Sequence, residues 1–132
     1  MAGNGYEKTE EELLKERAEA LGRTGLALSE VLEKLSDLDF SIRKKTELLQ
    51  FSRGTVTEKQ ERARIKEINE EIRVYNVTRK QAQLRYYYLI VTREAVGFRK
   101  HKWVEEVYRI PPVKRPISLS ETEKPKERKT NG

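Results

Sequence analysis

The chain has 132 residues, of which 38% are charged and 36% are apolar, and its net charge is +6. It contains no cysteine, which excludes disulfides, thiol catalysis and cysteine-based metal sites. No basic segment followed by an apolar run opens the sequence, and the longest apolar run, Tyr86–Val91, is far shorter than the ~20 residues that span a bilayer. These features predict a soluble, cytoplasmic protein that does not enter the membrane.

The first predicted element is a helix over residues 9–52. Thr9 and Glu12 match a capping box, in which the hydroxyl accepts a hydrogen bond from a backbone amide and the carboxylate reaches back to the helix start. Apolar residues recur every seven positions along this segment, which predicts one buried stripe along a helix. The members of this first stripe are Leu14, Leu21, Leu28, Leu35, Ile42 and Leu49.

Gly22 and Gly25 lie inside this helix, where each glycine costs about 1 kcal/mol relative to alanine. Two interpretations are open. In the first, the helix kinks or breaks at residues 22–25. In the second, the glycines make room for bulky side chains of a partner helix, which in the predicted pairing are those of Arg85, Tyr86 and Tyr88.

A turn at Ser52–Val56 separates the first helix from a second one, which is predicted over residues 57–108. Gly54 favours the left-handed backbone conformation that ends a helix, and Thr57 with Gln60 matches another capping box. The second helix carries its own stripe at the same interval. Its members are Ile68, Tyr75, Ala82, Leu89, Val96 and Trp103.

The two stripes match each other in antiparallel order. Apolar partners are residues whose numbers sum to 110, as in Leu28 with Ala82 and Ile42 with Ile68, and the midpoint of this sum falls in the predicted turn. The predicted fold class is therefore all-α, a long antiparallel helical hairpin of the coiled-coil type over residues 9–110.

Both ends of the chain are predicted to lie outside the hairpin. Residues 1–8 are expected to form a flexible lead-in, and residues 111–132 a disordered basic tail. Pro111 and Pro112 lack the amide protons that a helix needs, and the stretch after Ile117 is polar.

The run Tyr86–Val91 covers every side of a helix, whereas one partner helix buries a stripe only about 100° wide. A second copy of the hairpin would cover the remainder, giving a homodimer as a four-helix bundle. Alternatively, the lead-in or residues 110–117 fold back over the tyrosines. The candidate interaction surface consists of Tyr86, Tyr87, Tyr88, Ile90 and Val91, and five further apolar residues also lie off the first stripe, namely Leu13, Leu26, Phe40, Leu48 and Phe51.

Catalytic and metal chemistry have little support in the sequence. Metal sites in helical bundles typically use a Glu-x-x-His pair, but the residue three positions before the one histidine, His101, is Phe98. We therefore expect His101 to be a surface residue, and we expect no catalytic, metal or cofactor site.

The positive charge is concentrated in the second half of the chain. The net charge is −2 over residues 1–57, +4 over 58–108 and +4 over 109–132. Nucleic-acid binding would use this charge, although in the predicted pairing the acidic start of the first helix neutralises part of it. The candidate basic patch consists of Arg79, Lys80, Arg85, Arg93, Arg99, Lys100, Lys102, Lys114 and Arg115.

From these observations we expect a non-enzymatic helical module for protein–protein interaction or scaffolding. Its expected partners are a second copy of itself and another protein. The alternative is a helical accessory protein that binds nucleic acid through the basic residues of the second helix and the tail. The two expectations differ in salt dependence, because counterion release makes nucleic-acid affinity fall steeply with ionic strength.

Overall fold

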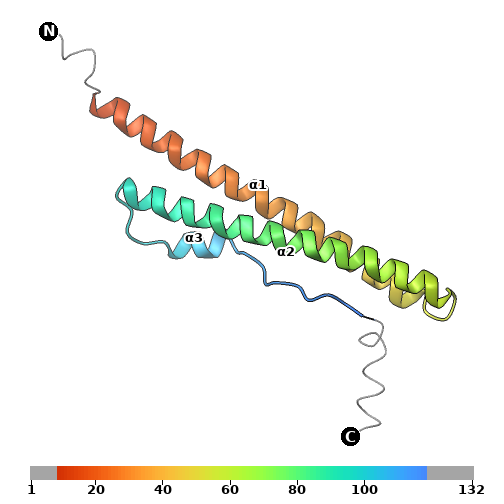
Figure 1. Cartoon of the computed structure of the whole chain (residues 1–132). Coiled ribbons are helices and arrows are strands. Elements are labelled where there is room, and N and C mark those ends of the chain that lie inside the picture. The colour runs from red at the N-terminus through yellow and green to blue at the C-terminus, as the bar shows by residue number, and fades with distance from the viewer. Residues whose placement is uncertain (1–8, 119–132) are drawn as a thin grey trace, which may run out of the picture. The chain divides into compact units, whose positions relative to one another are not determined.

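A computed structural model of the protein describes residues 9–118 (Figure 1). The described chain contains no strand, so the predicted all-α class is confirmed, and its two long helices pack against each other as a hairpin. The predicted lead-in, residues 1–8, lies outside the described residues, as does the part of the predicted tail after residue 118. The helices are α1 (Glu10–Phe51), α2 (Glu58–Ala95) and α3 (Lys102–Val107).

The chain forms two compact units, and α1 and α2 contribute to both. Unit 1 comprises Met1–Leu32 and Gln81–Ile110, and unit 2 comprises Glu33–Lys80 and Pro111–Gly132. The core of unit 1 contains Leu28, Ala82, Leu89 and Val104, and that of unit 2 contains Leu35, Ile42, Leu49, Ile65, Ile68, Ile72 and Tyr75.

The predicted helix starts and the turn are confirmed. Thr9 N donates to Glu12 Oε1 over 2.9 Å, and Glu12 N donates to Thr9 Oγ1 over 3.1 Å. Thr57 and Gln60 make the equivalent pair at 3.0 and 3.1 Å. Gly54 has φ +86° in the turn between α1 and α2, a conformation that glycine adopts without strain. These local contacts fix where the two long helices begin.

Unit 2 shows the antiparallel pairing directly. Ser41 Oγ donates to Glu71 Oε1 over 2.7 Å, and Lys45 Nζ contacts Glu67 Oε2 at 2.5 Å and also Glu71. Burial works to raise the pKa of Glu71, but the hydrogen bonds from Lys45 and Ser41 outweigh it and hold the pKa below its ordinary value. Residues with rising numbers on α1 therefore meet residues with falling numbers on α2.

The predicted stripes are buried along most of their length, but the residues at their outer ends are exposed. Leu14 is 61% exposed and Trp103 is 51% exposed, although both were predicted to be core residues. The reason is that α2 ends at Ala95, so the prediction of one helix over residues 57–108 is wrong.

The end of α2 is set by a backbone motif around Gly97. Gly97 has φ +108°, its amide donates to Glu94 O over 3.1 Å, and the Phe98 amide donates to Arg93 O over 2.9 Å. This pair of bonds is the Schellman arrangement that satisfies the last carbonyls of a helix. The chain then turns and continues into the short helix α3.

Arg93 and His101 hold α3 to the end of α2 within unit 1. Arg93 is only 5% exposed and lies over the rings of Phe98 and Trp103, with its Cζ at 4.7 and 5.3 Å from their centroids. Its Nε donates to His101 Nδ1 over 3.1 Å, and His101 Nε2 lies 3.2 Å from Glu94 Oε2. The His101 side chain is 15% exposed, so it is half-buried, with both ring nitrogens in contact with side chains of α2.

The helix α1 is continuous through both glycines, so the break considered at residues 22–25 does not occur. A Cβ atom added at Gly25 would lie 3.3 Å from Tyr108 Oη, whereas one added at Gly22 would meet nothing within 4 Å. Gly25 therefore makes room for a residue that follows α3. No side chain of α2 lies within 4 Å of a Cβ atom added at either glycine.

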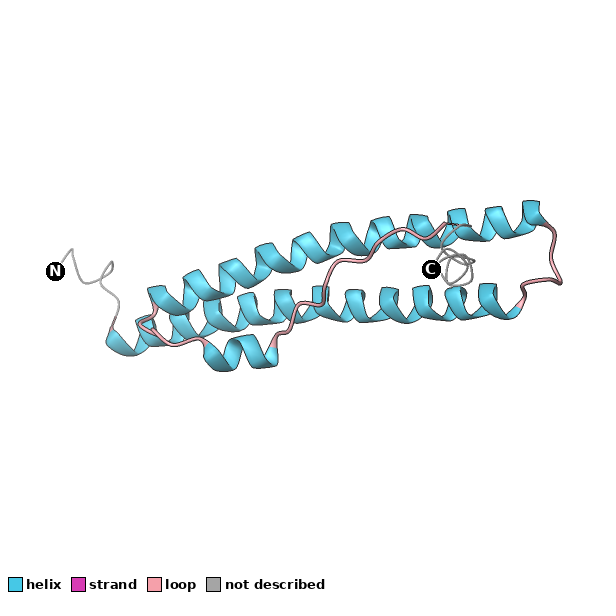
Figure 2. Cartoon of the chain, turned by 90° about the horizontal axis from the view of Figure 1, so that it is seen from below, coloured by secondary structure: helices cyan, strands magenta, loops and turns pink. Residues whose placement is uncertain are grey.

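Residues 111–118 form an extended segment that runs alongside α2 in unit 2 (Figure 2). The prediction of a disordered tail therefore does not hold for these residues, because α2 hydrogen-bonds to their backbone. Among the described residues, no helix combines the length and the apolar composition needed to cross a membrane.

Candidate functional site

Two asparagines of α2 bind the backbone of the extended segment in unit 2. Asn76 Nδ2 donates to Lys114 O over 2.8 Å, and the Lys114 amide donates to Asn76 Oδ1 over 3.0 Å. Asn69 makes the same pair of bonds with Ile117, both at 2.8 Å. Each side-chain amide thus pairs with both the carbonyl and the amide of one extended residue.

The spacing of the asparagines matches the rise of an extended chain. Asn69 and Asn76 are seven residues apart on a helix, which at 1.5 Å per residue is roughly 10.5 Å. Their partners, Ile117 and Lys114, are three residues apart in an extended chain, which spans about 10 Å. One helical face can therefore present side-chain amides in register with every third residue of an extended peptide.

Two further donors of α2 bind carbonyls of the proline pair. Tyr75 Oη donates to Pro112 O over 3.0 Å, and Arg79 Nε donates to Pro111 O over 2.6 Å. Proline has no amide proton, so these positions offer only an acceptor, and the helix supplies donors there.

One side chain of the segment is also recognised. Lys114 Nζ lies 2.6 Å from Asp39 Oδ1 on α1 and 5.0 Å from the centroid of the Tyr75 ring. The hydrogen bond from Lys114 holds the pKa of Asp39 below its ordinary value, against the opposing effect of burial. Burial raises the pKa of Tyr75, and the charge of Asp39 adds to this effect. Asp39 and Tyr75 together form a site for one lysine.

The predicted interaction surface divides into exposed and covered residues. In unit 1, Tyr87 is 61% exposed, and Tyr88 and Val91 are each 43% exposed. Tyr86 and Ile90 are half-buried. Tyr86 borders a hollow with Glu105 and Tyr108, so the chain after α2 covers part of the tyrosine run.

Leu84, which is 49% exposed, belongs to the same face of α2 but is missing from the sequence-based prediction. Gln81, Leu84, Tyr88 and Val91 follow the alternating three- and four-residue spacing of a coiled-coil seam. This spacing was the sequence signal that could have identified Leu84 as part of the face. We call Leu84, Tyr87, Tyr88 and Val91 the α2 apolar face of unit 1.

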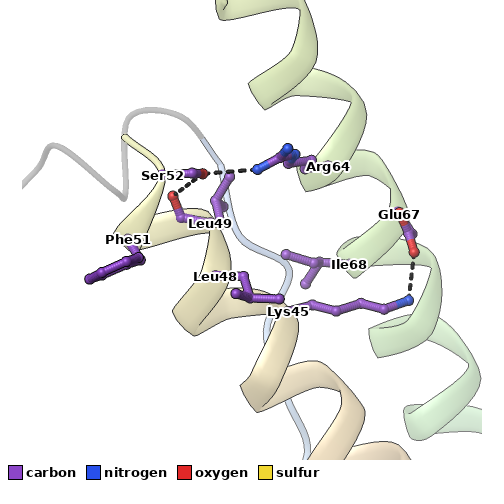
Figure 3. Close-up of a pocket in the computed structure, with 8 residues that line it drawn as sticks. All are labelled: Lys45, Leu48, Leu49, Phe51, Ser52, Arg64, Glu67 and Ile68. Carbon is purple, nitrogen blue, oxygen red and sulfur yellow. Dashed lines mark hydrogen bonds and ion pairs between the residues drawn. The ribbon is translucent and has the colours of Figure 1, made fainter. Parts of the chain in front are cut away.

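A second apolar feature lies in unit 2 near the turn between α1 and α2. It is a hollow of about 340 Å³, in which Lys45 pairs with Glu67 and Arg64 donates to Ser52 (Figure 3). Phe51 is 90% exposed and points away from the other lining residues in Figure 3. The polar groups of this hollow bind one another. The lining residues are Lys45, Leu48, Leu49, Phe51, Ser52, Arg64, Glu67 and Ile68.

Three of the nine predicted basic residues are engaged in contacts within their own unit. Arg93 is buried, Lys114 is paired with Asp39, and Arg79 binds Pro111. The six others are exposed. Unit 2 holds Arg79, Lys80, Lys114 and Arg115, whereas unit 1 holds Arg85, Arg93, Arg99, Lys100 and Lys102.

Within residues 9–118, no group of three or more His, Asp or Glu side chains is arranged to hold a metal ion. Comparison with known proteins gives no relative: no protein-family model, curated protein or solved structure matches this chain.

Proposed function

We propose that this chain is a non-enzymatic helical module that pairs with a second copy of itself and binds another protein. The observation that carries the proposal is the α2 apolar face of unit 1. Two tyrosines, a leucine and a valine there are 43–61% exposed, although the same stretch of α2 also provides buried core residues.

The geometry of this face favours a helical partner. Leu84, Tyr88 and Val91 have the spacing at which one helix packs knobs into the holes of another. Exposed tyrosines also suit protein interfaces, because the ring provides apolar contact area while the hydroxyl keeps a polar partner. A second copy supplies a matching face, because a two-fold interface uses the same surface on both chains.

Nucleic-acid binding has less support from the same structure. Three of the nine candidate basic residues, Arg79, Arg93 and Lys114, already make contacts inside the fold. Sequence-independent nucleic-acid binding depends on the number of phosphates neutralised, so each engaged cation weakens that interpretation.

Light scattering at micromolar concentration tests self-association. We expect the unmodified chain to have twice its 15.5 kDa mass, and the Leu84→Glu, Val91→Glu double variant to have the monomer mass with an unchanged helical circular dichroism spectrum. Gln83→Glu, an exposed change on the same helix, is the matched control and should leave the dimer intact. A monomeric unmodified chain at all concentrations would refute the dimer.

A further inference from the structure

The contacts of the extended segment in unit 2 are made mostly with backbone atoms. Asn69, Tyr75, Asn76 and Arg79 make six hydrogen bonds, and each of them ends on a main-chain carbonyl or amide of residues 111–117. Main-chain groups are common to all peptides. The same side chains would therefore bind any chain that is extended in this register.

The bound segment itself lies at the protein surface. None of residues 111–118 is buried, and Val113 is 59% exposed. A segment that buries little apolar surface lies at the low end of the range of local opening free energies. It can therefore leave its site while the leucines and isoleucines of the unit 2 core stay packed, although Tyr75 then loses its contacts with Pro112 and Lys114.

We propose that the surface formed by Asn69, Tyr75, Asn76, Arg79 and Asp39, here named the peptide groove, binds an extended, lysine-containing segment of another protein. Residues 111–118 occupy this groove as an internal ligand that the partner displaces. The inference rests on the proposed role as a protein-binding module and names the second partner of that module.

The groove dictates the chemistry of its ligand. The lysine occupies the site formed by Asp39 and Tyr75, and its own amide must be free to pair with Asn76. The residue three positions later also needs its amide, which pairs with Asn69. Proline is compatible with the positions of Pro111, Pro112 and Pro116, where no amide bond is made, and it favours the extended form.

The internal segment competes with any ligand. Because the internal segment belongs to the same chain, its effective concentration at the groove is at least in the millimolar range, so an external peptide binds the unmodified chain only weakly. Substitutions within the internal segment that weaken its binding, and that leave the groove residues unchanged, should therefore expose the groove. Lys114→Pro with Ile117→Pro removes both amide donors and the lysine from the internal segment.

The test uses a fluorescein-labelled peptide with the sequence of residues 109–118 and measures its fluorescence anisotropy with full-length chains. We expect saturable binding to the Lys114→Pro, Ile117→Pro variant, and at least about tenfold weaker binding to the unmodified chain. Adding Asn69→Ala and Asn76→Ala to the variant should abolish binding. A peptide that carries proline at the positions of Lys114 and Ile117 is the matched control and should not bind.

Three results would overturn the proposal. The first is no binding to the proline variant while its circular dichroism spectrum remains helical. The second is equal binding with and without Asn69 and Asn76. The third is loss of the dimer mass in the proline variant, because this would assign the groove to the segment of a second copy. Light scattering on the same samples separates these results from failure of the proposed dimer, which the α2 apolar face forms independently of the groove.

Discussion

At the scale of single residues, Gly22 and Gly25 show how one neighbour decides the role of a glycine in a helix. Both lie in α1, but only Gly25 has a side-chain atom, Tyr108 Oη, within contact of an added Cβ. The sequence identified both positions and suggested that they make room. It could not name Tyr108, because the stripe that ends at Val96 and Trp103 predicted a helix where the chain turns back.

Replacement of each glycine by alanine tests this difference. Gly22→Ala should raise the free energy of unfolding by about 1 kcal/mol, because alanine restricts the unfolded chain and meets open space in α1. Gly25→Ala should raise the free energy of unfolding clearly less, because the added Cβ would lie 3.3 Å from the Tyr108 hydroxyl oxygen. Urea unfolding of the two variants measures both values. Equal gains would show that Tyr108 does not pack against α1.

Asn69 and Asn76 were not recognised from the sequence. Asparagine is a poor helix former, and two of them seven residues apart on one helix were a weak signal for a function other than helix formation. Their partner could not be inferred, because the segment that they bind is distant in sequence and is bound through its backbone, which carries no sequence signal. Its prolines indicated only that a helix must end.

The ion pair between Asp39 and Lys114 makes the attachment of the segment sensitive to acid. The pKa of Asp39 in the folded chain lies below its ordinary value of 3.8, so ionised Asp39 favours the folded state. This contribution is fully present above the ordinary value and is lost as the pH falls through the lowered folded value.

Thermal melting between about pH 5 and about pH 2 tests this dependence. The melting temperature of the unmodified chain should fall more steeply on acidification than that of Asp39→Asn, which has already lost the contribution. Asp37→Asn, at an exposed position of the same helix, should behave like the unmodified chain. Parallel curves for all three proteins would show that the pair adds nothing to stability.

At the scale of elements, the hairpin was predictable because its signals are local. The two capping boxes and Gly54 each act within a few residues, and the structure confirms them. The stripes repeat every seven residues along each helix and are buried except toward their outer ends. The end of α2 at Ala95 was not predicted, although Gly97 two residues later is a residue type that commonly ends a helix. The seven-residue repeat of apolar residues continues through Val96 and Trp103 and so favoured a longer helix. The backbone hydrogen bonds around Gly97 instead end α2.

The attachment of α3 depends on Arg93, and Arg93→Lys should destabilise the chain by about 1–3 kcal/mol. Lysine keeps the charge but cannot lie flat over both Phe98 and Trp103 while it donates to His101. Trp103 is the only tryptophan, so its emission should shift to longer wavelength as α3 loosens. The control Arg99→Lys, at an exposed position, should change neither quantity. Matching behaviour of the two variants would exclude this role for Arg93.

At the scale of the whole molecule, the all-helical class followed from composition and periodicity, whereas the binding surfaces did not. The sequence correctly showed that the run Tyr86–Val91 exceeds what one helix can cover. The fold-back over the tyrosines that was expected of residues 110–117 is found only at Ile110, because residues 111–117 bind α2 in unit 2, and the second copy stays a proposal. Residues after α2 cover Tyr86, while the α2 apolar face of unit 1 remains for the proposed partner chain.

The most direct test of self-association through this face is disulfide cross-linking of single-cysteine variants, because the chain has no cysteine of its own. Under mild oxidation at micromolar concentration, Tyr88→Cys should convert rapidly to a disulfide-linked dimer on a non-reducing gel. Glu19→Cys, at an exposed position of α1 in unit 1, should remain monomeric over the same time. Cross-linking of both variants at the same slow rate, or of neither, would contradict the account.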